Sequence, residues 1–479
     1  MHTPTTRASG AHIEFYQKTG KIHPRTTAGR YNSLRRAMVW FSQLLFYGGA
    51  WLSWDGRQAF LFDIAERKFY LFGLVLWPQD ALLAAVLLII AATALFLVTA
   101  VAGRLFCGFA CPQTVYTSIF RWVEARVEGD HIARLRLDEA PVSARKLRLK
   151  AAKHGAWLAI AAWTGITFVG YFTPIRELLW NLGPGDLGPW EGFWVFFYGA
   201  FTYLQAGFAR EMVCLHMCPY SRFQGVMFDA DTRTISYDAR RGEPRGRRGA
   251  AKLAAATGGD AANPIARAGG DCVDCTLCVQ VCPTGIDIRD GLQYQCINCG
   301  LCADACDDVM TRIGSSPGLI RMASESELAA PALPPASARA RAWRSPRALT
   351  YVAGLVVFSV LGASMLVNRT PLIVDVLRDR SALLREGTDG NVENAYTLKL
   401  MNLLERPREF RVAVEGPAGV HIAGRDTFAV DGGSVLPVPI TVASSAAAGL
   451  NGRQEIRFRI TAVDEPALAV TEASSFLLP

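Results

Sequence analysis

The chain has 479 residues, of which 51% are hydrophobic and 19% charged, and its mean hydropathy is +0.19. A positive mean hydropathy with so little charge excludes an intrinsically disordered chain and is unusual for a soluble enzyme, so it indicates several membrane spans. The net charge of +8 suggests nucleic-acid binding at first sight. Because the basic excess lies mostly beside the apolar stretches, where it suits anionic lipid headgroups, we expect membrane lipid and no nucleic acid as a partner.

Apolar stretches predict a multi-pass α-helical membrane protein. Residues 1–36 have no apolar core, which predicts a cytoplasmic segment without a cleavable signal peptide. Five later stretches are long enough, or nearly so, to cross a hydrocarbon layer about 30 Å thick. Three of them have 18 residues each, a length that a buried core helix also has. The predicted spans are Ala37–Trp54, Ala81–Ala102, Gly155–Phe172, Gly192–Ala209 and Ala348–Val367, and the first four make a region of residues 37–236.

The distribution of Lys and Arg predicts the orientation of these spans. Seven lie before the first span and ten lie between residues 104 and 153, whereas residues 55–80 hold three and residues 173–191 hold one. The basic side is cytoplasmic, so we expect the N-terminus and the long segment 210–347 inside. With an odd number of spans, the residues after Val367 are expected outside.

Two cysteine pairs repeat each other after the second and the fourth span. The sequences are Cys107-Gly-Phe-Ala-Cys111-Pro112 and Cys214-Leu-His-Met-Cys218-Pro219. In a helix, a spacing of four places both sulfur atoms on one face. The proline after the second cysteine would interrupt a continuing helix but is tolerated at the start of a new one.

These four edge cysteines form a candidate metal site at the cytoplasmic face. Thiolates from two neighbouring segments make a soft ligand set that favours Cu(I) over hard cations, with His216, Met212 and Met217 close by in the sequence. The alternative is that the cysteines are small buried residues near helix ends. The repetition at matched membrane depth favours the metal site.

A second group of cysteines follows a basic, Gly- and Ala-rich stretch that predicts a flexible linker at residues 237–270. Residues 271–322 contain Cys272-x-x-Cys275-x-x-Cys278-x-x-x-Cys282-Pro283 and then Cys296-x-x-Cys299-x-x-Cys302-x-x-x-Cys306-Asp307. A 4Fe-4S cluster needs four thiolates, and in such paired runs the fourth cysteine of each run reaches the other cluster. Structural zinc is the alternative, but zinc sites use pairs separated by longer spacers. The pattern therefore predicts a cytoplasmic ferredoxin-like domain with two 4Fe-4S clusters, one held by Cys272, Cys275, Cys278 and Cys306 and the other by Cys282, Cys296, Cys299 and Cys302.

The remaining chain comprises a linker at residues 323–347, the last span at 348–367 and a C-terminal domain at 368–479. No cysteine occurs after Cys306, so this domain has to fold without disulfides. Short β-branched or alternating runs separated by Gly, Pro, Asn and Asp predict an antiparallel β-sandwich of about 100 residues. The predicted strands are Tyr396–Asn402, Glu409–Val414, Ile440–Ser444 and Glu455–Val463.

Several motifs resemble the cytochrome c oxidase accessory proteins called CcoG, FixG or RdxA. They occur in the order of that family and extend over nearly the whole chain. Asp307 replaces the proline usual after the last cluster cysteine, and Arg247–Gly269 looks like a variable insertion. The matching stretches are Gly56–Asp63, Phe69–Gly73, Trp77–Asp80, Cys107–Thr117, Gly242–Arg245, Asp271–Asp307 and Asn394–Lys399.

The resemblance implies a bacterial cytoplasmic-membrane protein with an immunoglobulin-like periplasmic domain at its C-terminus. It also implies a role in assembling a cbb-type haem-copper oxidase, with reduction of Cu(II) to Cu(I) as a cupric reductase. In that interpretation a cytoplasmic donor of unspecified identity supplies electrons through the clusters to copper at Cys107, Cys111, Cys214 and Cys218. Oxidase-assembly or copper-handling proteins are the implied partners, and the oligomeric state is left open, with a homodimer among the options.

Two other functions are left open by the residues alone. The protein could be a membrane electron-transfer subunit that feeds a quinone or a partner reductase, with the edge cysteines in a structural role. In that first case the edge cysteines could instead serve the partner. The protein could also be a copper-binding assembly scaffold without redox chemistry, whose clusters only stabilise the fold.

Overall fold

The computed structural model describes residues 22–246, 270–329, 335–379, 385–386, 391–445 and 452–478. The described residues form two compact units, one within residues 1–73 and 84–359 and the other within residues 74–83 and 360–479. Most of the predicted basic linker, residues 247–269, lies outside the described part of the chain, as do residues 1–21 of the N-terminal segment.

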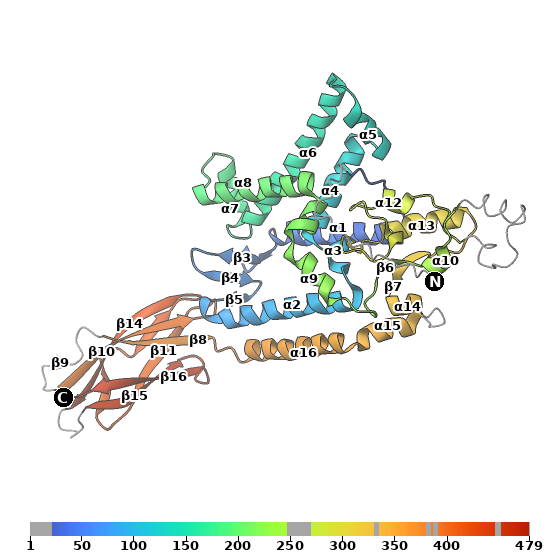
Figure 1. Ribbon diagram of the computed structural model, residues 1–479. Helices are drawn as coiled ribbons and strands as arrows, with labels where there is room; N and C mark the ends of the chain where they lie inside the picture. The colour runs from blue at the N-terminus through green and yellow to red at the C-terminus, as the bar shows by residue number, and fades with distance from the viewer. Residues whose placement is uncertain are drawn as a thin grey trace, which may run out of the picture. The chain divides into compact units, whose positions relative to one another are not determined.

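Helices make up most of the first unit (Figure 1). The helices in chain order are α1 (Arg30–Gly49), α2 (Ala81–Ala102), α3 (Leu105–Phe109), α4 (Pro112–Val127), α5 (His131–Glu139), α6 (Ala144–Val169), α7 (Ile175–Leu182), α8 (Pro189–Leu204), α9 (Pro219–Met227), α10 (Ala239–Gly242), α12 (Leu277–Gln280), α13 (Leu301–Arg312), α14 (Glu325–Ala329), α15 (Pro335–Arg344) and α16 (Pro346–Val367). Two π-helical turns, Gln205–Ala209 and Val213–Met217, lie between α8 and α9.

The predicted spans correspond to helices with different boundaries. The second span coincides with α2, and α16 contains the fifth. The first span is only partly helical, because α1 ends at Gly49 and the chain then turns into a short strand at Ser53. Two consecutive glycines, which are poor helix formers, end the helix at this point. Two helices in the described part of the chain, Pro78–Ala102 and Pro346–Val367, are long and apolar enough to cross a membrane.

The segments on either side of the cluster cysteines are more ordered than predicted. Part of the first predicted linker belongs to a small antiparallel sheet, in which β6 (Thr234–Tyr237) pairs with β7 (Ile320–Ala323). The second predicted linker, at residues 323–347, contains the helices α14 and α15. Its Ala- and Arg-rich composition has a high helix propensity, which explains the difference. The remaining short strands are β1 (Ser53–Trp54), β2 (Arg57–Gln58), β3 (Phe60–Asp63), β4 (Lys68–Leu71) and β5 (Leu74–Leu76).

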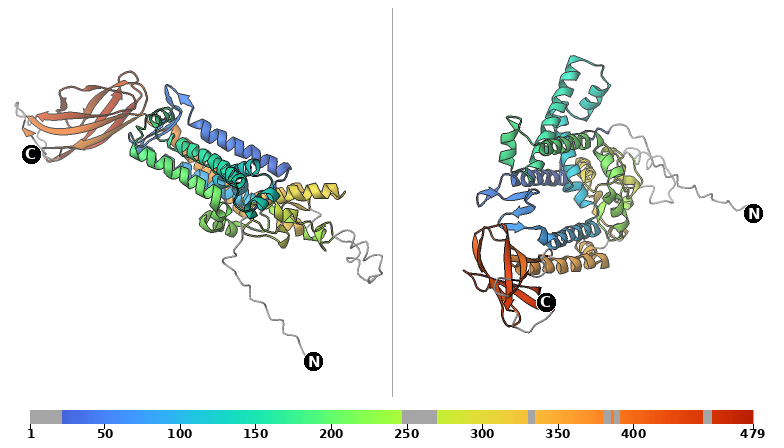
Figure 2. Two further views of the ribbon diagram at one scale, coloured as in Figure 1. Left: turned by 90° about the horizontal axis from the view of Figure 1, so that it is seen from above. Right: turned by 90° about the vertical axis from the view of Figure 1, so that its left-hand side faces the viewer.

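The C-terminal domain consists of two antiparallel sheets that pack face to face (Figure 2). Alternating residues of β10 and β11 are buried, and the hydroxyl of the buried Tyr396 donates a hydrogen bond to the carbonyl oxygen of Ser475 at 2.8 Å. Each of the four predicted strands overlaps a longer observed strand. One sheet has the order β12-β14-β10-β8, with β9 also paired to β10, and the other has the order β13-β11-β15-β16. The strands are β8 (Leu372–Arg378), β9 (Arg385–Glu386), β10 (Asn391–Asn402), β11 (Arg408–Glu415), β12 (Val420–Ala423), β13 (Thr427–Val430), β14 (Val435–Ser445), β15 (Arg453–Ala462) and β16 (Ala469–Leu477).

Candidate redox site

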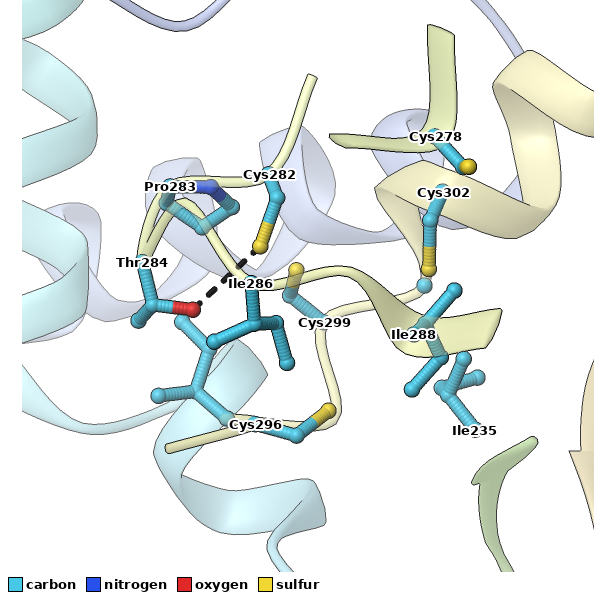
Figure 3. A pocket seen from close by; sticks show the side chains of 12 residues that line it. Ile235, Cys278, Cys282, Pro283, Thr284, Ile286, Ile288, Cys296, Cys299 and Cys302 are labelled. Carbon is cyan, nitrogen blue, oxygen red and sulfur yellow. Dashed lines mark hydrogen bonds between the residues drawn. The ribbon is translucent and has the colours of Figure 1, made fainter. Parts of the chain in front are cut away.

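The eight cysteines of the ferredoxin-like segment surround two cavities. The sulfur atoms of Cys282, Cys299 and Cys302 point into one of them, and Cys296 approaches it from the adjoining loop (Figure 3). Cys278 lines both cavities. The second cavity is lined by Cys272, Cys275, Cys278 and Cys306, so each cavity has the four cysteines that the spacing assigns to one cluster.

Left-handed backbone conformations form the tight loops between these cysteines. Thr276 has a φ of 57° and precedes α12, and Asn298 and Gly300 have φ values of 60° and 74° ahead of α13. At Gly300 a Cβ atom would also collide with the ring of Tyr31. The loop before α13 therefore depends on a glycine and on close packing of the N-terminal segment.

Burial acts on several of the cluster thiols. It raises the pKa of Cys278 to about 11 and the pKa values of Cys296 and Cys306 to about 12. All twelve cysteines are free thiols, and nowhere in the described residues are three His, Cys, Asp or Glu side chains placed to hold a metal ion together. Four thiols around each cavity are nevertheless the donor set that a 4Fe-4S cluster requires, and binding it would release their protons.

Each edge pair spans a break between two helical segments. Cys107 lies in α3 and Cys111 is the N-cap of α4, which begins at Pro112. In the second pair Cys214 lies in a π-helical turn and Cys218 is the N-cap of α9, which begins at Pro219. The proline thus starts a new helix, as one of the two sequence interpretations expected.

Each of the two pairs has an equivalent hydrogen bond that the cysteine spacing did not predict. The hydroxyl of Thr114 donates to the carbonyl oxygen of Cys107 at 2.6 Å, and the hydroxyl of Ser221 donates to that of Cys214 at 2.5 Å. Both donors stand three residues after the second cysteine of their pair. The sequence indicates this hydrogen bond only by a hydroxyl-bearing residue at the same position in both repeats.

The fold brings the two edge pairs close to each other. The thiol of Cys107 donates a hydrogen bond at 3.3 Å to Oε1 of Gln224, which belongs to α9 of the second repeat. Burial, and then the proximity of Cys111 and Cys107, raises the pKa of Cys214 to about 12. His216, Met212 and Met217 are exposed, whereas the four edge cysteines are partly buried.

The edge cysteines lie directly against the loop of the second cluster. A Cβ atom on Gly108, between Cys107 and Cys111, would lie 2.7 Å from the carbonyl oxygen of Ile297 and 3.0 Å from Cα of Cys299. The side-chain amide of Asn298 donates to the carbonyl oxygen of Ala102 at 3.0 Å, so the cluster loop is also tied to the end of α2. The two cysteine groups, far apart in the sequence, are therefore neighbours.

Arg104 bridges the three segments that meet here. Its guanidinium group is buried and donates hydrogen bonds to the carbonyl oxygens of Tyr294, just before Cys296, and of Ser221. It also interacts electrostatically with Cys107, Cys296 and Cys214. A buried cation at this position stabilises thiolates of the edge cysteines and of the second cluster loop. The sequence did not indicate this role, because Arg104 is one of many basic residues in its loop.

A buried ion network supports the π-helical segment that carries Cys214. Arg210, which joins the two π-helical turns, has a φ of 44° and places Nη2 2.6 Å from Oε1 of Glu124. Arg134 and Lys153 lie 3.3 Å and 3.9 Å from the same carboxylate. A positive φ is unusual for arginine, so we attribute it to this ion pair with α4.

Comparison with known protein families assigns three regions of the chain. Residues 209–325 match the model of a 4Fe-4S dicluster domain, and residues 83–128 match that of a 4Fe-4S binding domain, a range that includes Cys107 and Cys111. Residues 363–479 match the IG-like fold at the C-terminal of FixG. The nitrogen fixation protein FixG of Rhizobium meliloti is 36% identical over 92% of both chains. The chain belongs to the FixG/RdxA family.

Two further FixG/RdxA relatives come from Cereibacter sphaeroides. Protein RdxA is 38% identical over 89% of this chain and 87% of its own, and protein RdxB is 36% identical over 88% and 87%. A crystal structure of a FixG-related protein from Vibrio parahaemolyticus covers 23% of this chain and 97% of its own, at 28% identity and a TM-score of 0.21. Membership of the FixG/RdxA family establishes an iron-sulfur protein with a redox role and an immunoglobulin-like C-terminal domain.

Proposed function

We propose that this FixG/RdxA protein reduces Cu(II) to Cu(I) at Cys107, Cys111, Cys214 and Cys218 during assembly of a cbb-type oxidase. The observation that carries the proposal is the direct contact between Gly108, inside the first edge pair, and the Ile297–Cys299 loop. Electron transfer falls steeply with distance, so a thiolate site that touches the cluster loop is well placed to receive electrons.

The residues would divide the task between binding and positioning. Cys272, Cys275, Cys278 and Cys306 would hold one 4Fe-4S cluster and Cys282, Cys296, Cys299 and Cys302 the other, and such clusters supply one-electron transfer. At the edge site Cu(II) would accept one electron from a cytoplasmic donor and become Cu(I), which soft thiolates bind better than Cu(II). Arg104 would keep the edge thiolates and the Cys296 loop together.

The apolar surfaces of the first unit support its placement in a membrane. Trp40 and Leu44 of α1 are 69% and 70% exposed, and Phe196 of α8 is 75% exposed. Large apolar side chains on the outside of several helices indicate contact with lipid rather than water. The proposed placement is the bacterial inner membrane, with the cluster segment on the cytoplasmic side and the C-terminal domain in the periplasm.

The test uses the full-length protein, purified without oxygen and reduced with dithionite. After removal of excess dithionite, added Cu(II) should reoxidise the clusters, seen as a rise in visible absorbance, and a Cu(I) chelator should report an equal number of electrons. Cys107→Ala combined with Cys214→Ala should abolish the reaction while iron content is retained. Met217→Leu, a change at an exposed thioether beside Cys218 that lies outside the proposed four-cysteine site, is the matched control and should react normally.

Other outcomes select the alternative functions. Clusters that are not reoxidised by Cu(II), or a double edge variant with an unchanged rate, would leave an electron-transfer subunit whose acceptor is a partner protein or a quinone. Cupric reduction that persists after Cys278→Ala with Cys299→Ala would indicate a scaffold with incidental thiol chemistry.

A further inference from the structure

Three arginines with little exposure lie around the second cluster site. They come from three different parts of the fold, Arg35 from α1, Arg104 from the N-cap of α3 and Arg121 from α4. Arg35 and Arg104 are buried, and the side chain of Arg121 is only 17% exposed. Arginine is rarely buried without a partner, so the charges around these three side chains need an account. The cysteines that line this site are Cys282, Cys296, Cys299 and Cys302.

Two of the arginines are hydrogen-bonded to the loops that carry these cysteines. Arg121 donates at 3.5 Å to the carbonyl oxygen of Pro283, the residue after Cys282. Arg104 donates to the carbonyl oxygen of Tyr294, two residues before the next cysteine. Both guanidinium groups are therefore held beside backbone that positions a cluster ligand.

The third arginine reaches the same site from the side of the edge cysteines. Arg35 donates at 3.1 Å to the carbonyl oxygen of Gly108 and at 3.1 Å to the hydroxyl of Ser118. Gly108 packs against Cys299, since a Cβ atom on the glycine would lie 3.0 Å from Cα of the cysteine. Arg35 and Arg121 both interact electrostatically with Cys299. The three cations thus surround one cluster site from three directions.

A carboxylate offsets only one of these cations. Glu211 forms an ion pair with Arg121. Within the described ranges, neither Arg35 nor Arg104 has a carboxylate oxygen within 4 Å of its guanidinium group, and their hydrogen bonds go to carbonyl or hydroxyl oxygens instead. The second cluster site therefore has an excess of buried positive charge.

The first cluster site has a different balance of charge. It is lined by Cys272, Cys275, Cys278 and Cys306. Arg289 also lines it, but this cation pairs with Asp287 at 2.6 Å and with Asp274 at 2.5 Å. Asp307 adds a third carboxylate, which interacts electrostatically with Cys306. Because Cys275 is exposed, water and salt also screen the charges at this site.

We propose that Arg35, Arg104 and Arg121 raise the reduction potential of the second cluster above that of the first. A 4Fe-4S cluster gains one negative charge on reduction, and its potential depends on the net charge around it. Buried cations stabilise that added charge strongly, because the protein interior screens them less than water does. The reduced form is therefore favoured at the cluster site that lies against the edge cysteines.

This order of potentials deepens the proposed function, and only its consequence for copper rests on that function. Cys278 lines both cluster sites, so the two sites are adjacent. The exposed Cys275 makes the first site the one that a cytoplasmic donor can approach. One electron would pass from the first cluster, which is oxidised, to the second, which is reduced, and no atom moves. The arginines would thereby direct electrons towards the edge cysteines.

The test is a redox titration of the full-length protein, purified without oxygen and without copper, followed by EPR spectroscopy of the reduced clusters. The parent protein should show two midpoint potentials. Arg35→Gln should lower the higher one by about 59 mV or more, which is a tenfold change in the equilibrium constant of a one-electron step. Arg35→Lys keeps the charge but not the planar fork of donors, and it should retain most of the parent potential.

Other variants assign the two potentials and control for unrelated effects. Arg289→Gln should lower only the lower potential, because Arg289 lines the first site. Arg312→Gln removes an exposed arginine that pairs with Asp308 and should change neither potential. Iron content checks that both clusters are retained. Arg121→Gln, which should also lower the higher potential, replaces Arg35→Gln if that variant loses iron.

Three results would overturn the assignment. The first is that Arg35→Gln leaves the higher potential unchanged. The second is that Arg35→Lys lowers it as much as Arg35→Gln does, which would indicate a structural role for the hydrogen bonds. The third is that Arg289→Gln moves the higher potential. Because copper is absent, failure here leaves cupric reduction standing, and failure of cupric reduction leaves the order of potentials standing.

Discussion

Gly108 is the residue at which the two cysteine groups meet most closely. Its missing side chain lets the backbone of α3 pack against backbone atoms of Ile297, Asn298 and Cys299. Backbone atoms cannot rotate away from an added methyl group as a flexible side chain can. The glycine is therefore needed for a close approach and not for an unusual φ angle, since no left-handed conformation is found there.

We expect Gly108→Ala to move the edge cysteines away from the loop Ile297–Cys299, which carries a ligand of the second cluster. The added methyl group forces a backbone shift that costs about 1–3 kcal/mol, as other overpacked sites do. The melting temperature and the rate of electron transfer from dithionite-reduced clusters to Cu(II) should both fall.

Gly225→Ala provides the matched control for this change. Gly225 lies in α9 of the second repeat, and a Cβ atom there would meet nothing within 4 Å. Replacing a helical glycine by alanine should raise stability by up to about 1 kcal/mol. Equal losses in the two variants would show that the close contact at Gly108 has no special role.

At the scale of elements, the π-helical segment before α9 depends on a helix far away in the sequence. Glu124 of α4 is 1% exposed and accepts from Arg210 at 2.6 Å. Burial alone would raise the pKa of Glu124, but Arg210, Lys153 and Arg134 outweigh burial and lower it. The carboxylate is therefore charged in the folded protein and holds three buried cations around it.

This network predicts a loss of stability in acid. A lowered pKa contributes stability above the pKa of the unfolded glutamate, about 4.3, and this contribution is lost as the pH falls through the lower folded value. Glu124→Gln should lower stability at pH 7 by about 3–5 kcal/mol, the usual result of removing one partner from a buried ion pair. It should also flatten the dependence of the melting temperature on pH below about 4.3.

Glu66→Gln is the control for this prediction, because Glu66 forms an exposed ion pair with Lys68. Exposed pairs contribute about 0–1 kcal/mol, so the melting curve should be almost unchanged. The interpretation fails if Glu124→Gln melts like the parent protein at pH 7, or if the two variants respond equally to acid.

The elements that sequence could predict are those defined by neighbouring residues. The apolar run from Ala81 to Ala102 predicts both ends of α2 correctly. The alternation of apolar and polar residues in β10 and β11 predicts the strands of the sandwich. The π-helical turns were not predictable because their geometry depends on Arg210 meeting Glu124, 86 residues away. Asn298 is a similar case, since its partner Ala102 is 196 residues distant.

At the scale of the whole molecule, the C-terminal domain has a core of its own. Its two sheets bury Leu398, Phe410, Phe458 and Phe476 almost completely. A sandwich with a complete core needs no cofactor for its folding. We expect residues 368–479, produced alone, to be soluble and free of iron, with a β-sheet circular dichroism spectrum and one cooperative melting transition. A fragment that aggregates or melts without cooperativity would show that the domain depends on the rest of the chain.

Membrane topology can be argued from contacts within the first unit. The backbone amides of Tyr31 and Asn32, at the start of α1, donate to the carboxylate of Asp304 in α13. The last residue of α2, Ala102, accepts from Asn298 in the cluster loop. The start of α1 and the end of α2 therefore lie on the same side of the membrane as the cluster segment. If α2 crosses the membrane, the chain must already have crossed once between Asn32 and the start of α2, and α1 is the helix available.

Reporter fusions can test this prediction in living bacteria. Alkaline phosphatase, which is active only outside the cytoplasm, should be active when fused after Ile64, after Asp186 and at the C-terminus. A green fluorescent protein should fluoresce when fused after Val142, an 89% exposed residue between α5 and α6. If α2 and α16 alone crossed the membrane, Ile64 and the C-terminus would share one side, as they do with five spans. Tyr31 would then lie on that side as well, and Asp186 would lie on the side of Val142. With five spans, crossing by α1 places Tyr31 and Ile64 on opposite sides. Equal phosphatase activity of fusions after Asn32 and after Ile64 would therefore contradict the five-span topology, and activity only after Ile64 would support it.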